Sequence, residues 1–162
     1  MLHAGLMQKM IGFYQGDVHE ISHFLKVHAY ACLIGTLEGL DAHTQYLLEA
    51  EAIVHDIACP LCREKYGHAA GSLQEQESPA LLAEFLDGCG LTAEERARIS
   101  FVVAHHHTYT GVDGLDWQVL LEADFLVNAD EGHAEPEAIR RMEREVYRTS
   151  AGLALLRTIY LR

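Results

Sequence analysis

The sequence is poor in basic residues and lacks long apolar runs. It has 12 Lys and Arg against 24 Asp and Glu, and its formal net charge at pH 7 is −12. Without a basic stripe to neutralise phosphates, we expect no binding to polymeric nucleic acid. No apolar run has the length that crosses a bilayer, and no signal-peptide pattern opens the chain. We therefore expect no membrane partner and a cytoplasmic location.

Cysteines are few, and their spacing does not suit a thiol-based site. Cys32, Cys59, Cys62 and Cys89 are the four, and we expect them to be reduced in a cytoplasmic protein. Cys59 and Cys62 form one CxxC, without the second ligand pair of a structural zinc site or the preceding strand of a redox motif. We interpret the pair as packing residues and keep a thiol-based zinc or redox protein as the least favoured class.

Helical signals dominate the 162 residues, and strand signals are scarce. The spacing of caps and glycines predicts an all-α bundle of about seven helices in one domain over 1–162, whose helices after 135 pack back on the core. Residues 58–77 are expected to form a long irregular segment, and Ser78 with Pro79 to open the helix that follows. The expected helix-capping residues are Asp17, Asp41, Thr92 with Glu95, Asp116 and Glu135.

Ionisable side chains fall on the apolar faces of four expected helices. Asp124 lies in line with Leu120, Leu121 and Val127, and His23, the His55–Asp56 doublet and His106 are placed similarly. Taken singly, each has an alternative as a hydrogen-bonded core residue. Their coincidence favours one shared metal ion, because an unpaired buried charge is costly and mixed His and carboxylate sets suit transition metals. Helical spacing alone leaves His23 and His28 equally eligible.

The ordered set of His23, the His55–Asp56 doublet and Asp124 resembles the HD-domain phosphohydrolase superfamily, which is named after that doublet. The stretches HFLKVHAYACLIG, AIVHDIA and LLEADFLVN are similar to the family's three ligand-bearing helices. The resemblance covers about residues 17–130. It implies a compact HD-domain helical bundle in which these four residues bind a divalent metal.

The resemblance also separates His23 from His28, because the family's ligand His precedes a Val by four positions. His28 then becomes a supporting or core residue. Among characterised proteins, the pattern is similar to the subgroup with symmetrical diadenosine tetraphosphate hydrolases, which hold two irons. It is also similar to small bacterial HD proteins, through HHHTYT and LLEADFLVN. By resemblance, Glu77, standing where the subgroup has a His, and His106 complete a second site that Asp56 bridges.

The function implied by the resemblance is hydrolysis of a small phosphate ester, a nucleotide or dinucleotide, by metal-activated water. One or two ions of Fe, Mn, Co, Ni or Zn are expected, with Asp56 and His106 as catalytic residues. The alternative is a non-catalytic HD-type module that binds metal or nucleotide. A homodimer is a further possible partner state, because exposed helices could pair. The candidates for substrate contact or for support of the metal ligands are Lys26, His28, Arg63, Lys65, His68, His105 and His107.

Overall fold

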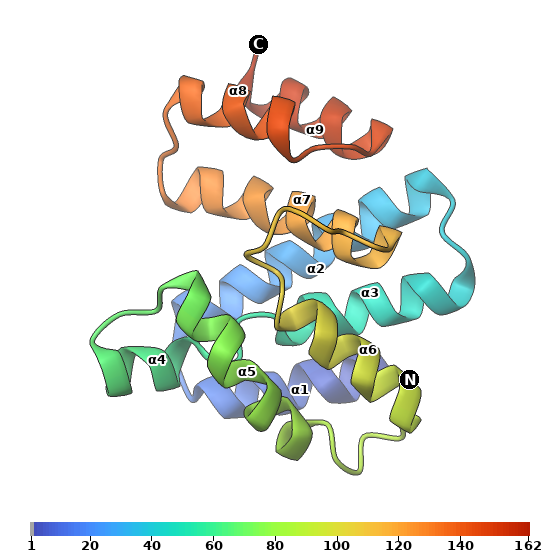
Figure 1. The fold of residues 1–162 in the computed structure, drawn as a ribbon, viewed down its shortest axis with the longest axis vertical. Helices are drawn as coiled ribbons and strands as arrows, with labels where there is room; N and C mark the ends of the chain where they lie inside the picture. Colours follow the sequence, from blue (N-terminus) through green and yellow to red (C-terminus); the bar gives the residue numbers. More distant parts are fainter. Residues whose placement is uncertain (1) are drawn as a thin grey trace.

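The computed structural model describes residues 2–162, except for the side chain of Leu2, and is helical throughout (Figure 1). No strand occurs in these residues, so the all-α class is confirmed, although the helices number nine rather than about seven. They are α1 (Leu2–Tyr14), α2 (Val18–Glu38), α3 (Ala42–Val54), α4 (Cys59–Tyr66), α5 (Gly71–Phe85), α6 (Ala93–Val103), α7 (Leu115–Glu131), α8 (Pro136–Glu145) and α9 (Ser150–Tyr160).

The prediction of an irregular segment over 58–77 is wrong, because α4 forms there and α5 begins at Gly71, seven residues before the predicted start at Ser78. This segment contains all of α4 and the first half of α5. Pro79 lies inside α5 instead of opening a helix. An interior proline costs about 3 kcal/mol, and the cost is offset here because α5 packs against α6 and buries Ser78, Leu82 and Phe85. Tertiary packing thus overrides the local signal.

Three of the predicted caps are confirmed, whereas Glu135 stands at the N-cap position of α8 without a side-chain hydrogen bond. The Asp17 carboxylate accepts a backbone hydrogen bond at the start of α2, and Gly39 ends that helix in the left-handed region at φ 72°. Asp41 accepts two backbone hydrogen bonds at the start of α3. Thr92 and Glu95 form a reciprocal capping box at the start of α6.

The predicted cap at Asp116 is wrong. The N-cap position of α7 is Gly114, two residues before Asp116, and glycine has no side chain to cap with. The Asp116 carboxylate instead binds the Arg98 guanidinium of α6 through two contacts of 2.7 Å. A charged partner from another helix outweighs the local capping interaction.

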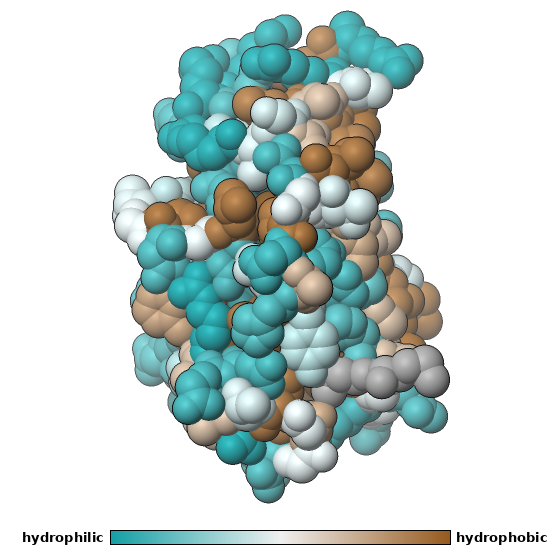
Figure 2. Space-filling view, turned by 90° about the vertical axis from the view of Figure 1, so that its right-hand side faces the viewer, coloured by the Kyte–Doolittle hydropathy of each residue, from teal (hydrophilic) through white to brown (hydrophobic). Residues whose placement is uncertain are grey.

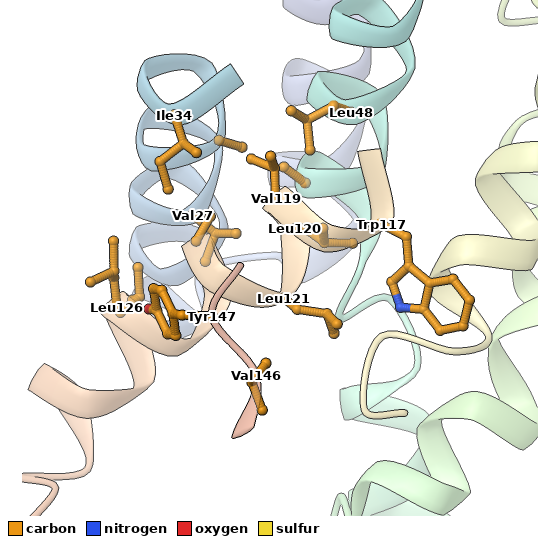
Figure 3. Packing of buried hydrophobic residues seen from close by; sticks show 14 of the residues in the cluster. Val27, Ile34, Leu48, Trp117, Val119, Leu120, Leu121, Leu126, Val146 and Tyr147 are labelled. Carbon is orange, nitrogen blue, oxygen red and sulfur yellow. The ribbon is translucent and has the colours of Figure 1, made fainter. Parts of the chain in front are cut away.

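The interior is organised around α7, which lies between the α8–α9 pair and the α2–α3 pair (Figure 1). Ile34, Leu48 and Val119 meet where α2, α3 and α7 come together (Figure 3). α9 contacts α2 and α7 and buries Leu156, so the C-terminal helix packs on the core as expected. A second apolar cluster joins α1 to α2, α3, α5 and α6, and its buried members include Leu6, Met10, Phe24, Ile53 and Ile99.

The outer surface mixes hydrophilic and hydrophobic side chains, as the face in Figure 2 shows. Among residues 2–162, no helix combines the length and the apolar character that crossing a membrane requires. Exposed apolar side chains such as Val18 and Leu37 occur on several helices. Single exposed apolar residues are normal on the surface of folded proteins.

Glu51 of α3 is a destabilising residue of this interior. It is fully buried, and neither carboxylate oxygen has a hydrogen-bond partner. Burial raises its pKa well above the ordinary value; the Asp116 charge raises it further, and Arg98 opposes this. The folded state therefore holds a proton that the unfolded chain releases above about pH 4.3. The contribution of Glu51 to stability consequently falls as the pH rises from about 4.3 toward its raised pKa in the folded state.

Replacing Glu51 with Met, which has a similar length and no charge, is expected to raise the free energy of unfolding at pH 7 by about 1–3 kcal/mol. The gain should shrink below about pH 4.3, where the unfolded chain is increasingly protonated as well, and the part that remains is the cost of burying a carboxyl without a hydrogen-bond partner. Chemical denaturation across pH measures it, with Glu84→Met on the exposed side of α5 as the control. A loss of stability at every pH would show that the carboxylate makes a stabilising ion pair.

Candidate metal centre

Three helices bring four donor atoms together in the interior. His23 comes from the first half of α2, Asp124 from the middle of α7, and His55 with Asp56 from the turn directly after α3. His23 Nε2 lies 3.2 Å from His55 Nε2, 3.2 Å from Asp124 Oδ1 and 3.3 Å from Asp56 Oδ2. His55 Nε2 lies 3.4 Å from Asp124 Oδ1 and 3.5 Å from Asp56 Oδ2.

The other ring nitrogen of each imidazole is already committed. His55 Nδ1 donates to the carbonyl oxygen of Ala52 at 2.9 Å, and His23 Nδ1 donates to Glu131 Oε2 at 2.8 Å. When the rings are neutral, these bonds place the proton on Nδ1, so each Nε2 carries a lone pair and no proton. Lone pairs then face carboxylate oxygens, which are also acceptors. A shared cation resolves this conflict, and such Nδ1 partners are typical of metal-binding histidines.

The electrostatics of the group favour positive charge between its members. Burial lowers the pKa of His23, but Asp124, Asp56 and Glu131 outweigh it and raise that pKa to about 10. Burial likewise opposes, and the two aspartates raise, the pKa of His55. Burial raises the pKa of Asp124, whereas His23 and His55 hold it well below the usual range. The carboxylates that would retain protons on the rings would also attract a divalent cation.

A second group shares Asp56. Its Oδ1 lies 3.3 Å from His106 Nε2, while its Oδ2 faces His23 and His55. His106, in the turn after α6, donates from Nδ1 to the carbonyl oxygen of Val103 at 2.7 Å, and its buried Nε2 has no hydrogen-bond partner. His107 follows, and its Nε2 is also buried and unpartnered. Asp56, His106 and His107 have donor atoms within 4.8 Å of one another and could hold a metal ion.

Glu77, predicted from sequence to complete this second group, is engaged elsewhere. Its Oε1 accepts a hydrogen bond from Lys65 Nζ at 2.7 Å and another from the Tyr66 hydroxyl. It belongs to no group of metal-competent donors with Asp56, whereas His107 forms such a group with Asp56 and His106. The physical reason is the folding of 58–77 into α4 and α5, which turns Glu77 toward α4.

The support of His107 was not foreseen from the sequence. Glu75 Oε1 accepts hydrogen bonds from the His107 backbone N–H at 3.0 Å and the Thr108 hydroxyl at 2.9 Å. Gly71, the first residue of α5, lies so close that a Cβ there would stand 2.6 Å from the His107 ring. Glu75 and Gly71 carry no local motif, because both act on a residue more than 30 positions away.

A cavity of about 180 Å³ opens onto both groups. Arg63 is the one Lys or Arg in its described lining, and its guanidinium binds the buried carboxylate of Glu20. Lys26, nearby on α2, binds Glu131. The lining consists of His19, Glu20, His23, Asp56, Cys59, Arg63, Ala69, Gln74, His107, Asp124, Asn128 and Glu131.

The remaining candidates lie outside this lining. His28 contacts Cys32 and Glu49, and Lys65 binds Glu77. His68 is exposed, and its Nδ1 accepts a hydrogen bond from the backbone of Ala70. His105 Nδ1 donates to the carbonyl oxygen of Phe101 at 2.6 Å, and its ring packs on Trp117. Of the thiols in the CxxC, Cys59 lines the cavity and Cys62 is buried.

Comparison with known proteins found no match to a protein-family model, to a curated protein or to a solved structure. The likeness to the HD superfamily therefore depends on the residues themselves.

Replacing Gly71 with Ala is expected to lower the free energy of unfolding by about 1–3 kcal/mol, because the added methyl displaces the His107 ring. Gly5→Ala on α1, where a Cβ meets nothing within 4 Å, is the matched control and should raise stability by about 0.5–1 kcal/mol. Urea denaturation measures both. Equal effects of the two substitutions would mean that His107 does not pack against α5.

Proposed function

We propose that this chain is a metal-dependent hydrolase of small phosphate esters, with a nucleotide or dinucleotide as the substrate class. The observation that carries the proposal is the meeting of imidazole Nε2 atoms and carboxylate oxygens beside an open cavity. His23, His55, Asp56 and Asp124 would hold the cation, and the ordered likeness of these residues to the HD superfamily supports the reaction class. The nitrogen and oxygen donors suit Fe, Mn, Co, Ni or Zn.

A second cation is proposed at Asp56, His106 and His107, with Asp56 as the bridge through its two oxygens. A divalent cation at such a site supplies a water of lowered pKa and neutralises charge on phosphoryl oxygens. The chain's own contribution is orientation: the carbonyl oxygens of Ala52 and Val103 keep Nε2 of His55 and His106 free to bind.

The cavity bears on the size of the substrate. Its volume of about 180 Å³ is below the roughly 300–1,000 Å³ of pockets that enclose a drug-sized ligand. It suits a phosphoryl group inside, with the remainder of a nucleotide extending outward. Arg63, held in place by Glu20, is the cation positioned to bind a phosphoryl oxygen.

One observation favours the alternative, a non-catalytic HD-type module that binds metal. The two basic side chains beside the cavity, Arg63 and Lys26, are each paired with a carboxylate, Glu20 and Glu131. Since the chain is strongly acidic, an anionic substrate would depend almost entirely on the bound cation for attraction.

The deciding experiment uses two aspartates of the same helix. Asp124→Asn is expected to reduce hydrolysis of a phosphate-ester panel, and the affinity of the candidate metal centre for its cation, by more than the roughly 10–100-fold that losing a supporting partner costs. Asp130→Asn, on the exposed side of α7, should keep both. Metal is counted by elemental analysis. Wild-type protein that takes up no metal under loading conditions would refute the proposal, and metal without hydrolysis would establish the module.

The second cation has its own test. His107→Ala is expected to remove one of the two metal equivalents of the candidate metal centre and leave the other, since the ligands of the first group stay intact. Glu77→Gln should leave both, because Glu77 is bound to Lys65 and Tyr66. The opposite pattern would restore Glu77 as the ligand and show that α4 and α5 are arranged differently.

A further inference from the structure

A second cluster of metal-competent side chains lies on another side of α2. His28 and Cys32 stand one helical turn apart, and Glu49 of α3 faces them. His28 follows His23 by five positions, a rotation of about 140° around the helix axis. The cluster therefore does not join the candidate metal centre, and the proposed hydrolase makes no use of it.

The donor atoms of this cluster are spaced as ligands of one ion. Cys32 Sγ lies 3.5 Å from His28 Nε2, which lies 3.6 Å from Glu49 Oε2. All three donors lie within 4.8 Å of one another. Around a tetrahedral zinc, with Zn–S about 2.3 Å and Zn–N about 2.0–2.1 Å, neighbouring ligand atoms are roughly 3.3–3.6 Å apart.

The Glu49 carboxylate is held in place from both sides. Its Oε1 accepts a hydrogen bond from Gln45 Nε2 at 2.9 Å, and its Oε2 lies 3.0 Å from His3 Nδ1. The His3 ring is fixed in turn by Tyr46, whose carbonyl oxygen lies 2.9 Å from Nε2. Carboxylates that bind metals are usually oriented by such partners. Here α1 supplies the partner His3.

The pKa values of His28 and Cys32 are compatible with binding a cation that accepts nitrogen and sulfur ligands. Burial lowers the pKa of His28, more than Glu49 raises it, so the ring keeps a free lone pair at neutral pH. Burial, with the Glu49 charge, raises the pKa of the Cys32 thiol to about 12. A cation that binds sulfur would displace this thiol proton to solvent. Half-burial of all three residues leaves an open position for water.

We propose that His28, Cys32 and Glu49 form a peripheral zinc site, with a water as the fourth ligand and His3 as the residue that orients Glu49. Thiolate, imidazole and carboxylate together suit Zn²⁺ and disfavour Mg²⁺ and Ca²⁺. The site ties α2 to α3, the helix that ends directly before His55. It therefore fixes the relative position of two elements that carry the candidate metal centre.

Cobalt titration of the metal-free, full-length protein tests the site, because a thiolate bound to Co²⁺ gives a charge-transfer band that histidine and carboxylate ligands do not. The band is expected in wild type, in Cys89→Ser and in Cys59→Ser, which removes the thiol beside Asp56. It should be absent in Cys32→Ser, and Zn²⁺ should abolish it in wild type. A band that persists in Cys32→Ser, or no band in wild type, would overturn the proposal.

Two further variants keep the test valid if Cys32→Ser fails to fold, which circular dichroism reports. Glu49→Gln keeps the size of the side chain and removes a charged ligand. It should weaken cobalt binding more than His3→Phe, for which we expect a loss of about 10–100-fold. Unchanged affinity in Glu49→Gln would refute the site. Because the readout needs neither phosphate-ester hydrolysis nor metal at His23, its failure and that of the proposed function are distinguishable.

Discussion

Acceptor atoms that face acceptor atoms at the inner end of a cavity are the constraint on which the rest of this structure depends. The Nε2 atoms of His23 and His55 point at oxygens of Asp56 and Asp124, and these side chains are largely buried. Such an arrangement is stable only with positive charge between its members, whether protons or a metal ion. The hydrogen bonds that set the tautomers come from the backbone and from Glu131, so the fold itself prepares the imidazoles for a cation.

The helical framework serves this centre by holding its contributing segments against one another. α2 and α7 pack closely along the core shown in Figure 3, and α3 ends where the His-Asp doublet must turn inward. The same helices α2 and α3 carry the proposed zinc site on a different side. Asp56 joins the two halves of the candidate metal centre because each of its oxygens faces a different set of histidines. Rigidity of these helices thus sets the distances at both places.

Local chemistry determined much of what the sequence could predict. Asp17, Gly39 and Thr92 act on backbone groups within a few residues, so the limits of α2 and the start of α6 could be read directly. The inward position of His23 and Asp124 follows from apolar residues three and four places away on the same helix. Burial of these ionisable groups was therefore predictable, and with it their need for a partner.

Contacts between distant segments decided the remainder. Pro79 lies inside a helix because α6 covers that helix, and Glu77 turns to Lys65 because α4 forms at all. His107 lies near Asp56, and Gly71 allows this because it has no side chain to clash with the His107 ring. By itself the sequence determined the helical class and the inward position of His23 and Asp124, since both depend on neighbours along one helix, whereas the burial of Glu51 was not predicted. Only the tertiary structure decided which of them meet, because ligand distances depend on how separate helices pack.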